Sequence, residues 1–123
     1  MKRLLYVDDD PAMLEELSRH IRENFPGIEI LTCQNPIKAL SLINNSLDLL
    51  MIDLEMPAVD GKKLLMYATS LGLDKKKIII ISGRDADYLH EAIPMGLCLC
   101  VLNKHDASQK AVLDMVLAAM EKK

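Results

Sequence analysis

Leu47-Asp48-Leu49-Leu50-Met51-Ile52-Asp53 has the pattern of a short buried strand that ends in a carboxylate, and the other elements can be inferred outward from it. Leu54-Glu55-Met56-Pro57 and Val59-Asp60-Gly61 follow directly, and their proline and glycine are typical of turns. An apolar run of this length, rich in Leu and Ile, suits a strand that is covered on both faces. The pattern therefore predicts that Asp53 is presented at the edge of a sheet, where it can act chemically.

Other apolar runs of similar length follow the same pattern along the chain. Together they predict strands at residues 4–7, 28–31, 49–52, 78–81 and 97–102. Segments of helical period predict helices at residues 11–25, from residue 36, after Asp60-Gly61, at 85–93 and from 106 to the end. This strict alternation favours an α/β fold, a flavodoxin-like (βα)5 doubly wound parallel sheet with strand order 2-1-3-4-5. At this length, residues 1–123 are expected to form a single domain.

Apolar residues at helical spacing predict which side of each helix faces the sheet. In the second helix the inward residues are expected to be Ile37, Leu40 and Ile43. In the third helix the expected stripe is Leu64, Leu65, Ala68 and Leu71. The last helix carries two stripes: Val112, Met115, Val116 and Ala119, then Leu113, Leu117 and Met120. One stripe suffices for docking, so the surplus predicts an output or homodimer surface within residues 84–122, the alternative being a broad docking face.

Composition narrows the class of protein. Half of the residues are apolar, so a core can be buried without disulfides or a structural metal. The net charge of −3 lacks the basic stripe of nucleic-acid binding, so no direct contact with nucleic acid is expected. Three cysteines without ligand spacing indicate reduced thiols and a cytoplasmic protein. No apolar segment is long enough for a signal peptide or a membrane span, so no membrane partner is expected.

Polar side chains follow the predicted strands at the point where each strand ends. Strands one and three are neighbours in the expected order, and they end in Asp8-Asp9-Asp10 and in Asp53. The fourth strand ends in Ser82-Gly83 and the fifth in Asn103-Lys104, so all four groups fall on one rim. Repulsion between clustered carboxylates is unfavourable unless a cation or a shared proton offsets it. The pattern predicts a divalent metal at this rim with Asp53 as the nucleophile beside it, although singly these residues could be caps, turn residues or a solvated lysine.

These motifs resemble the receiver domain of two-component response regulators over essentially the whole chain. The resemblance rests on Val7-Asp8-Asp9-Asp10-Pro11, the stretch 51–57, Asp60-Gly61, the stretch 79–83 and Lys104. It implies a phosphoprotein of phosphorelay signal transduction, in which Asp53 accepts a phosphoryl group from a sensor histidine kinase or a histidine phosphotransfer protein. It also implies a conformational switch that controls an output, with no enzymatic activity beyond self-phosphorylation and self-dephosphorylation.

The resemblance assigns roles to the other rim residues. Mg²⁺ or Mn²⁺ would be held by oxygen ligands from Asp8, Asp9, Asp53 and the backbone carbonyl of Glu55, with Asp8 assisting through water or a hydrogen bond. Ser82 and Lys104 would contact the phosphoryl oxygens. Mg²⁺ prefers hard oxygen ligands, and phosphoryl transfer needs positioning and neutralisation of charge, so the residue types suit these roles. No general base is expected, because a carboxylate is already deprotonated at neutral pH.

Departures from the family pattern concern switching and signal lifetime. His105 replaces the usual proline, and because a cis bond there would cost about 3–4 kcal/mol, we expect a trans bond and an altered loop. Val101 replaces the usual switch aromatic, and its few rotamers predict a switch without ring rotation. By resemblance, Glu55 and Arg84 flank the path of the attacking water. Their opposite charges predict that they pair across the site and slow the loss of the phosphoryl group.

Two alternatives stay open at this point. A pseudo-receiver would keep the fold as a binding module without phosphorylation, although the presence of all five site residues argues against it. A haloacid-dehalogenase-like phosphatase would also use a strand-end Asp, then Ser or Thr, then Lys. Its nucleophile belongs on the first strand, here Asp8, but the required Asp-x-Asp-x-Thr/Val pattern fails at its last position.

Overall fold

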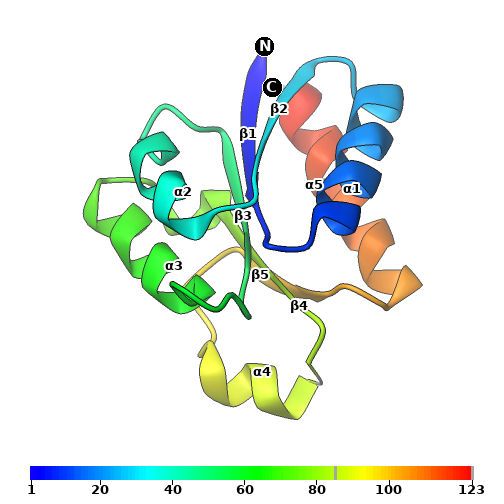
Figure 1. The fold of residues 1–123 in the computed structure, drawn as a ribbon. Helices are drawn as coiled ribbons and strands as arrows, with labels where there is room; N and C mark the ends of the chain where they lie inside the picture. The colour runs from blue at the N-terminus through cyan, green and yellow to red at the C-terminus, as the bar shows by residue number, and fades with distance from the viewer. Residues whose placement is uncertain (85, 123) are drawn as a thin grey trace.

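The computed structural model describes residues 1–84 and 86–122 as a parallel sheet with helices on both faces (Figure 1). The strands are β1 (Lys2–Val7), β2 (Ile28–Cys33), β3 (Leu49–Asp53), β4 (Ile78–Ser82) and β5 (Cys100–Asn103). The helices are α1 (Pro11–Asn24), α2 (Pro36–Leu42), α3 (Gly61–Ser70), the short η1 (Lys75–Lys77), α4 (Ala86–Ala92) and α5 (Ala107–Lys122). The strand order is β2-β1-β3-β4-β5, which confirms the flavodoxin-like prediction.

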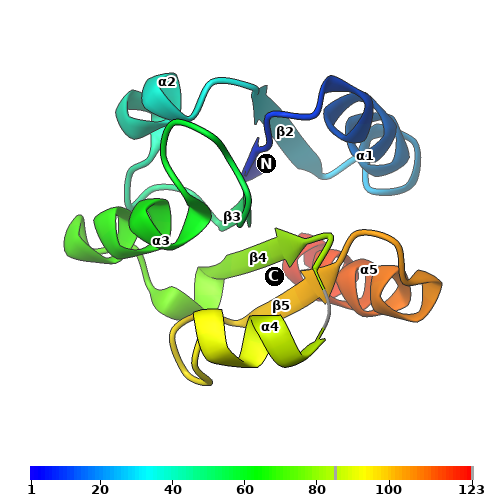
Figure 2. The ribbon, with the colours of Figure 1, turned by 60° about the horizontal axis from the view of Figure 1, so that its bottom comes forward.

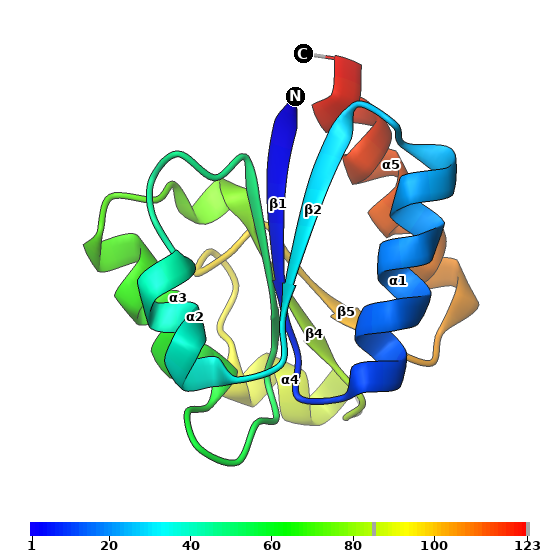
Figure 3. The same ribbon diagram turned by 45° about the horizontal axis from the view of Figure 1, so that its top comes forward.

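The sheet separates two apolar cores (Figure 3). Alternate residues of each strand point to opposite faces, so Leu5 and Val7 pack toward α2 and α3, while Leu4 and Tyr6 pack toward α1 and α5. Every residue of β3 and β4 is buried. This burial on both faces explains why the strands read as continuous apolar runs rather than alternating ones.

Three helices begin with a side-chain cap directly after the carboxyl rim of the sheet. The Asp10 carboxylate accepts hydrogen bonds from the backbone amides of Ala12 and Met13, and Pro11 occupies the first helical position of α1. Asn35 caps α2 in the same manner, and Asp60 caps α3. These caps fix the points at which the rim loops end, so the chain enters each loop from a strand and leaves it into a fixed helix.

Several predicted boundaries and buried positions were wrong. Strand β5 begins at Cys100 rather than at residue 97, after a turn in which Gly96 has a φ of 94°. Ile37 is 53% exposed because the seven-residue helix α2 buries Pro36 and Ala39 instead. Leu71 is 40% exposed because it follows the end of α3, and Leu73 takes the buried place.

The start of the last helix differs from prediction by one residue. The predicted first residue of the fourth helix, Asp85, and the last residue of the chain, Lys123, lie outside the described residues. Helix α5 begins at Ala107, because the Asp106 carboxylate accepts a hydrogen bond from the Ser108 amide at 2.9 Å and so terminates the preceding loop. In the described part of the chain, no helix has the length and apolar character needed to cross a bilayer.

Replacing Ser18 should stabilise the protein. Its side chain lies on α1 with 3% exposure, and its hydroxyl oxygen has no hydrogen-bond partner within the described part of the chain. Because an unsatisfied buried hydroxyl is unfavourable, Ser18→Ala should raise the free energy of unfolding by about 1 kcal/mol in urea denaturation. Ser41→Ala is the control, since that exposed hydroxyl donates to the Lys38 carbonyl. A loss of stability in Ser18→Ala would contradict this reading.

Candidate functional site

The carboxyl ends of β1 and β3 bring three acidic side chains together on the rim that Figure 2 turns forward. Asp8, Asp9 and Asp53 each offer an oxygen, and these three atoms lie within 4.8 Å of one another. Asp8 is 0% and Asp53 2% exposed, whereas Asp9 is half-buried. Val7 and Ile52 are partners in the β1–β3 ladder, so strand register alone places the following carboxylates side by side.

Both oxygens of Asp8 are engaged by protein donors. Its Oδ2 accepts a hydrogen bond from the Tyr6 hydroxyl at 2.5 Å and lies 2.9 Å from the Lys104 Nζ. Its Oδ1 accepts one from the Asp10 amide at 3.0 Å and lies 3.2 Å from the same Nζ. Burial and the contact with Asp8 raise the pKa of Tyr6 far above its usual range, so its hydroxyl remains a donor. Asp8 is therefore held in one orientation.

Tyr6 was missed at the level of sequence, although a signal existed. Residues two apart on a strand point to the same face, so Tyr6 and Asp8 lie on one side of β1. A lone aromatic with a polar tip, buried in an aliphatic strand, needs a hydrogen-bond partner, and Asp8 is the nearest polar residue on that side.

Asp53 lies in a setting that disfavours its charged form. Burial and the negative charge of Asp8 raise the pKa of Asp53 to about 8, while Lys104, with Nζ 3.4 Å from its Oδ2, acts in the opposite direction. Burial lowers the pKa of Lys104, but its contacts with Asp8 and Asp53 outweigh this and raise it. The sequence-based expectation of an ionised Asp53 at neutral pH did not include this burial, which favours the protonated carboxyl when no cation offsets the charge.

The three carboxylates fit a hard divalent cation. Mg²⁺ takes oxygen ligands and commonly uses one or two carboxylates together with water, and Asp9 and Asp53 supply two converging groups. Asp8 is occupied by Tyr6, Asp10 and Lys104, which suits an indirect role more than direct coordination. A cation bound here would also offset the repulsion that raises the pKa of Asp53.

Ser82, at the end of β4, bonds to Glu55 rather than to Asp53. Its hydroxyl lies 2.7 and 2.8 Å from the two Glu55 carboxylate oxygens, and it accepts a hydrogen bond from the Arg84 amide at 3.0 Å. The guanidinium of Arg84 lies over the Tyr88 ring, 4.0 Å from its centroid. The expected ion pair between Glu55 and Arg84 is absent from the described residues, because the Glu55 carboxylate bonds to Ser82 at the end of β4 and the Arg84 guanidinium lies over Tyr88.

The loop that carries Lys104 is tied to the loop after β4. The Lys104 amide donates to the Ser82 carbonyl at 2.9 Å. The Asn103 side chain donates to the Arg84 carbonyl at 3.0 Å and accepts from the His105 amide at 2.7 Å. The described residues contain no cis peptide bond, so the bond between Lys104 and His105 is trans, as expected. No sequence pattern indicated the bridging role of Asn103.

The close approach of the backbone at residue 61 to the loop after β3 requires a glycine there. A Cβ at this position would lie 2.5 Å from the Asp53 carbonyl oxygen and 2.7 Å from the Leu54 Cα, both of which are backbone atoms. The Gly61 amide donates to the Leu54 carbonyl at 2.9 Å. Only a residue without a side chain allows α3 to begin this close to the loop that presents Asp53.

A model of the response regulator receiver domain family matches residues 4–116. The chain belongs to this family. The receiver is 36% identical over 85 residues to the response regulator MprA of Mycobacterium sp. (strain KMS). These aligned residues make up 68% of this chain and 36% of that protein. It is 30% identical over 98 residues to the glycerol metabolism activator of Pseudomonas putida, and this alignment spans 78% of this chain and 44% of that protein. The receiver thus corresponds to well under two thirds of the length of these relatives.

Solved structures agree on the fold. The receiver matches the structure of an adenylate cyclase from Rhodopirellula baltica with a TM-score of 0.76 and 27% identity, over 98% of this chain and 87% of that one. It matches the receiver domain of a sensor histidine kinase from Pseudomonas aeruginosa with a TM-score of 0.79 and 17% identity, over 99% and 98% of the chains. That structure has a magnesium ion coordinated in its active-site cleft.

Removing the Asp53 carboxylate should stabilise the metal-free receiver in a pH-dependent way. The pKa of Asp53 is about 8 in the folded chain and about 4 when unfolded, so between these values the native state binds more protons. The contribution of Asp53 to the free energy of unfolding is therefore present at about pH 4 and is lost as the pH rises to about 8. Asp53→Asn does not titrate, so its advantage in urea denaturation should grow across this window.

The control for this measurement is Mg²⁺, which should shrink the advantage of Asp53→Asn by stabilising the charged carboxylate of the parent protein. A difference between parent and variant that stays constant with pH would show that Asp53 is ionised throughout and that its pKa is not raised.

Proposed function

We propose that residues 1–123 form one receiver domain in which Asp53 accepts a phosphoryl group from a histidine kinase or a histidine phosphotransfer protein. The observation that carries this proposal is the arrangement of Asp53 beside Asp8 and Asp9, with the Lys104 Nζ 3.4 Å from its carboxylate. The buried carboxylate can bond to phosphorus while the ammonium group draws the incoming anion. Phosphorylation then changes the state of an output in a two-component pathway of the cytoplasm.

The residues divide the work of phosphoryl transfer. A carboxylate oxygen of Asp53 forms a bond to phosphorus as the bond from phosphorus to the donor histidine nitrogen breaks, and the electron pair stays on that nitrogen. Lys104 would bind one phosphoryl oxygen, and the Ser82 hydroxyl would donate to another. Asp9, Asp53 and the backbone carbonyl of Glu55 would hold Mg²⁺ or Mn²⁺, with Asp8 assisting. When bound, the ion supplies positive charge that neutralises the phosphoryl oxygens and favours the ionised form of Asp53.

The contacts of Asp8 favour this assignment over a phosphatase that uses the first strand. Asp8 would be the nucleophile in that alternative, but its two oxygens are engaged by Tyr6, Asp10 and Lys104. Asp53 has fewer and longer contacts among the described residues: its Oδ1 accepts from the Glu55 amide at 3.2 Å, and its Oδ2 lies 3.4 Å from the Lys104 Nζ. The less engaged carboxylate is better placed to attack.

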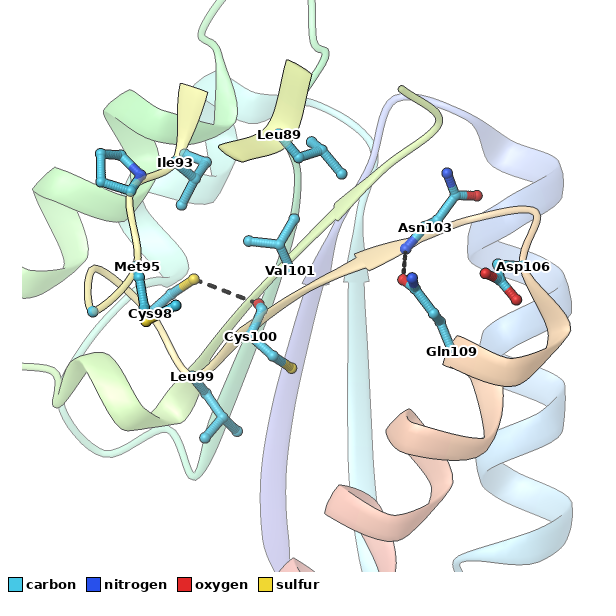
Figure 4. A pocket seen from close by; sticks show the side chains of 12 residues that line it. Leu89, Ile93, Met95, Cys98, Leu99, Cys100, Val101, Asn103, Asp106 and Gln109 are labelled. Atoms are coloured by element: carbon cyan, nitrogen blue, oxygen red, sulfur yellow. Dashed lines mark hydrogen bonds between the residues drawn. The ribbon is translucent and has the colours of Figure 1, made fainter. Parts of the chain in front are cut away.

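The face formed by α4, β5 and α5 is proposed as the surface for self-association. It contains a pocket of about 400 Å³, lined by side chains that include Leu89, Ile93, Met95, Leu99 and Val101 (Figure 4). Leu113 and Leu117 dock α5 on the sheet, whereas Met115 is 71% and Val112 41% exposed. Docking thus uses the stripe that contains Leu113 and Leu117; of the other stripe, Val116 also packs against the core, whereas Val112, Met115 and Ala119 are exposed.

Phosphorylation can be tested directly with a small phosphoramidate donor. With Mg²⁺ present, intact-mass analysis should show one added phosphoryl group, because Asp53 is expected to be the only acceptor. Asp53→Ala should abolish the mass increase, and chelation of the metal should prevent it in the parent protein. Asp74→Ala is the control, since Asp74 is exposed and caps η1 away from the rim. Label that persists in Asp53→Ala would refute the assignment.

Self-association can be tested by sedimentation with a phosphoryl analogue at high protein concentration. If the exposed stripe of α5 forms the interface, the parent protein should sediment as a dimer and Met115→Glu as a monomer, because a charge would be buried without a partner. Met66→Glu on α3 is a matched control, since Met66 is 52% exposed on another face. A parent protein that stays monomeric under all conditions would reject this surface.

A further inference from the structure

The hydroxyl of Ser82 is fully committed inside the protein. It is 0% exposed, and its oxygen lies 2.7 and 2.8 Å from the two oxygens of the Glu55 carboxylate. The Gly83 amide donates to the same carboxylate at 3.3 Å. A hydroxyl has a single proton to donate, so Ser82 cannot serve Glu55 and another anion at the same time.

Glu55 is held next to the acceptor residue by its own backbone. Its amide donates to Asp53 Oδ1 at 3.2 Å, and its half-buried side chain reaches across to the end of β4. Arg84 does not neutralise it, since the guanidinium lies over Tyr88, and no ion pair of the described residues involves Glu55. The carboxylate therefore depends on the hydroxyl and the amide for its hydrogen bonds.

Hydrogen bonds to an anion from a hydroxyl and a backbone amide are of the kind that a phosphoryl oxygen requires. We propose that the Glu55 carboxylate is an internal competitor for Ser82, which a phosphoryl group on Asp53 must displace. This inference rests on the proposed phosphorylation of Asp53. Displacement would free the Glu55 side chain and move the loop that contains Ser82 and Gly83, so Glu55 would hold the receiver in its resting state.

A double-mutant cycle with beryllium fluoride, which adds to aspartate carboxylates as a phosphoryl analogue, tests the competition. Glu55→Gln keeps the shape of the side chain but removes its charge, and a charge-assisted hydrogen bond is roughly twice as strong as a neutral one, so binding should tighten about tenfold. In a Ser82→Ala background the same change should have a much smaller effect, of roughly twofold, because the contested hydroxyl is gone. Glu23→Gln, an exposed substitution on α1, controls for the change in net charge.

A second measurement uses the unmodified protein. Amide hydrogen exchange at Gly83 should accelerate in Glu55→Gln, because the acceptor of that amide is weakened. Equal tightening with and without the Ser82 hydroxyl would overturn the competition and leave only a through-space charge effect. In that case the parent protein would still bind the analogue at Asp53, so the proposed function would stand. If the parent protein formed no adduct even with Mg²⁺, the proposed function and this inference would both be overturned.

Discussion

Two buried carboxylates share one ammonium group at the carboxyl rim of the sheet. This excess of potential negative over positive charge constrains the rest of the site. Asp8 and Asp53 both lie within 3.4 Å of the Lys104 Nζ, so one positive charge faces two potential negative ones. Asp8 is satisfied by additional donors, including Tyr6, and the remaining imbalance falls on Asp53, whose pKa rises to about 8. A proton can balance the charge, and so can a divalent cation held with Asp9. The folded chain thus favours the ionised nucleophile once positive charge is supplied.

The parallel sheet makes this concentration of charge possible. Strands β1, β3 and β4 are adjacent, and parallel strands end on the same rim, so residues far apart in sequence meet without long connections. Burying Asp53 is unfavourable, and the burial of the apolar side chains on both faces of β3 and β4 offsets this free energy. The fold and most rim residues could be predicted for this reason. Five apolar runs in strict alternation with helices permit few topologies, and the polar residue after each run is placed by the topology itself.

Side-chain partners were harder to predict, because they depend on geometry within a few ångströms. Charge complementarity suggested that Glu55 pairs with Arg84. Exposed ion pairs are weak, however, and Arg84 instead stacks on Tyr88, while Glu55 accepts from the nearby Ser82 hydroxyl. The prediction of which side of the short helix α2 is buried was wrong for a related reason. With only seven residues, α2 packs through Pro36 and the small Ala39, so helical spacing alone was too coarse.

Asn103 lies between the two residues near Lys104 that depart from the family pattern, Val101 and His105, and its hydrogen bonds link the loops around them. Val101 is half-buried and β-branched, so it offers little change of shape by rotation. The Asn103 side chain instead joins the Arg84 carbonyl to the His105 amide, and the Arg84 amide in turn donates to Ser82. A displacement of Ser82 that moves Arg84 must therefore either carry Asn103 with it or break the bond between them. Because the backbone amide of Asn103 also donates to the Gln109 side chain on α5, a displacement that carries Asn103 along would change the hydrogen bonding at the start of the last helix. Among the described residues, hydrogen bonds through Asn103 thus connect the loop after β4 to the first turn of α5.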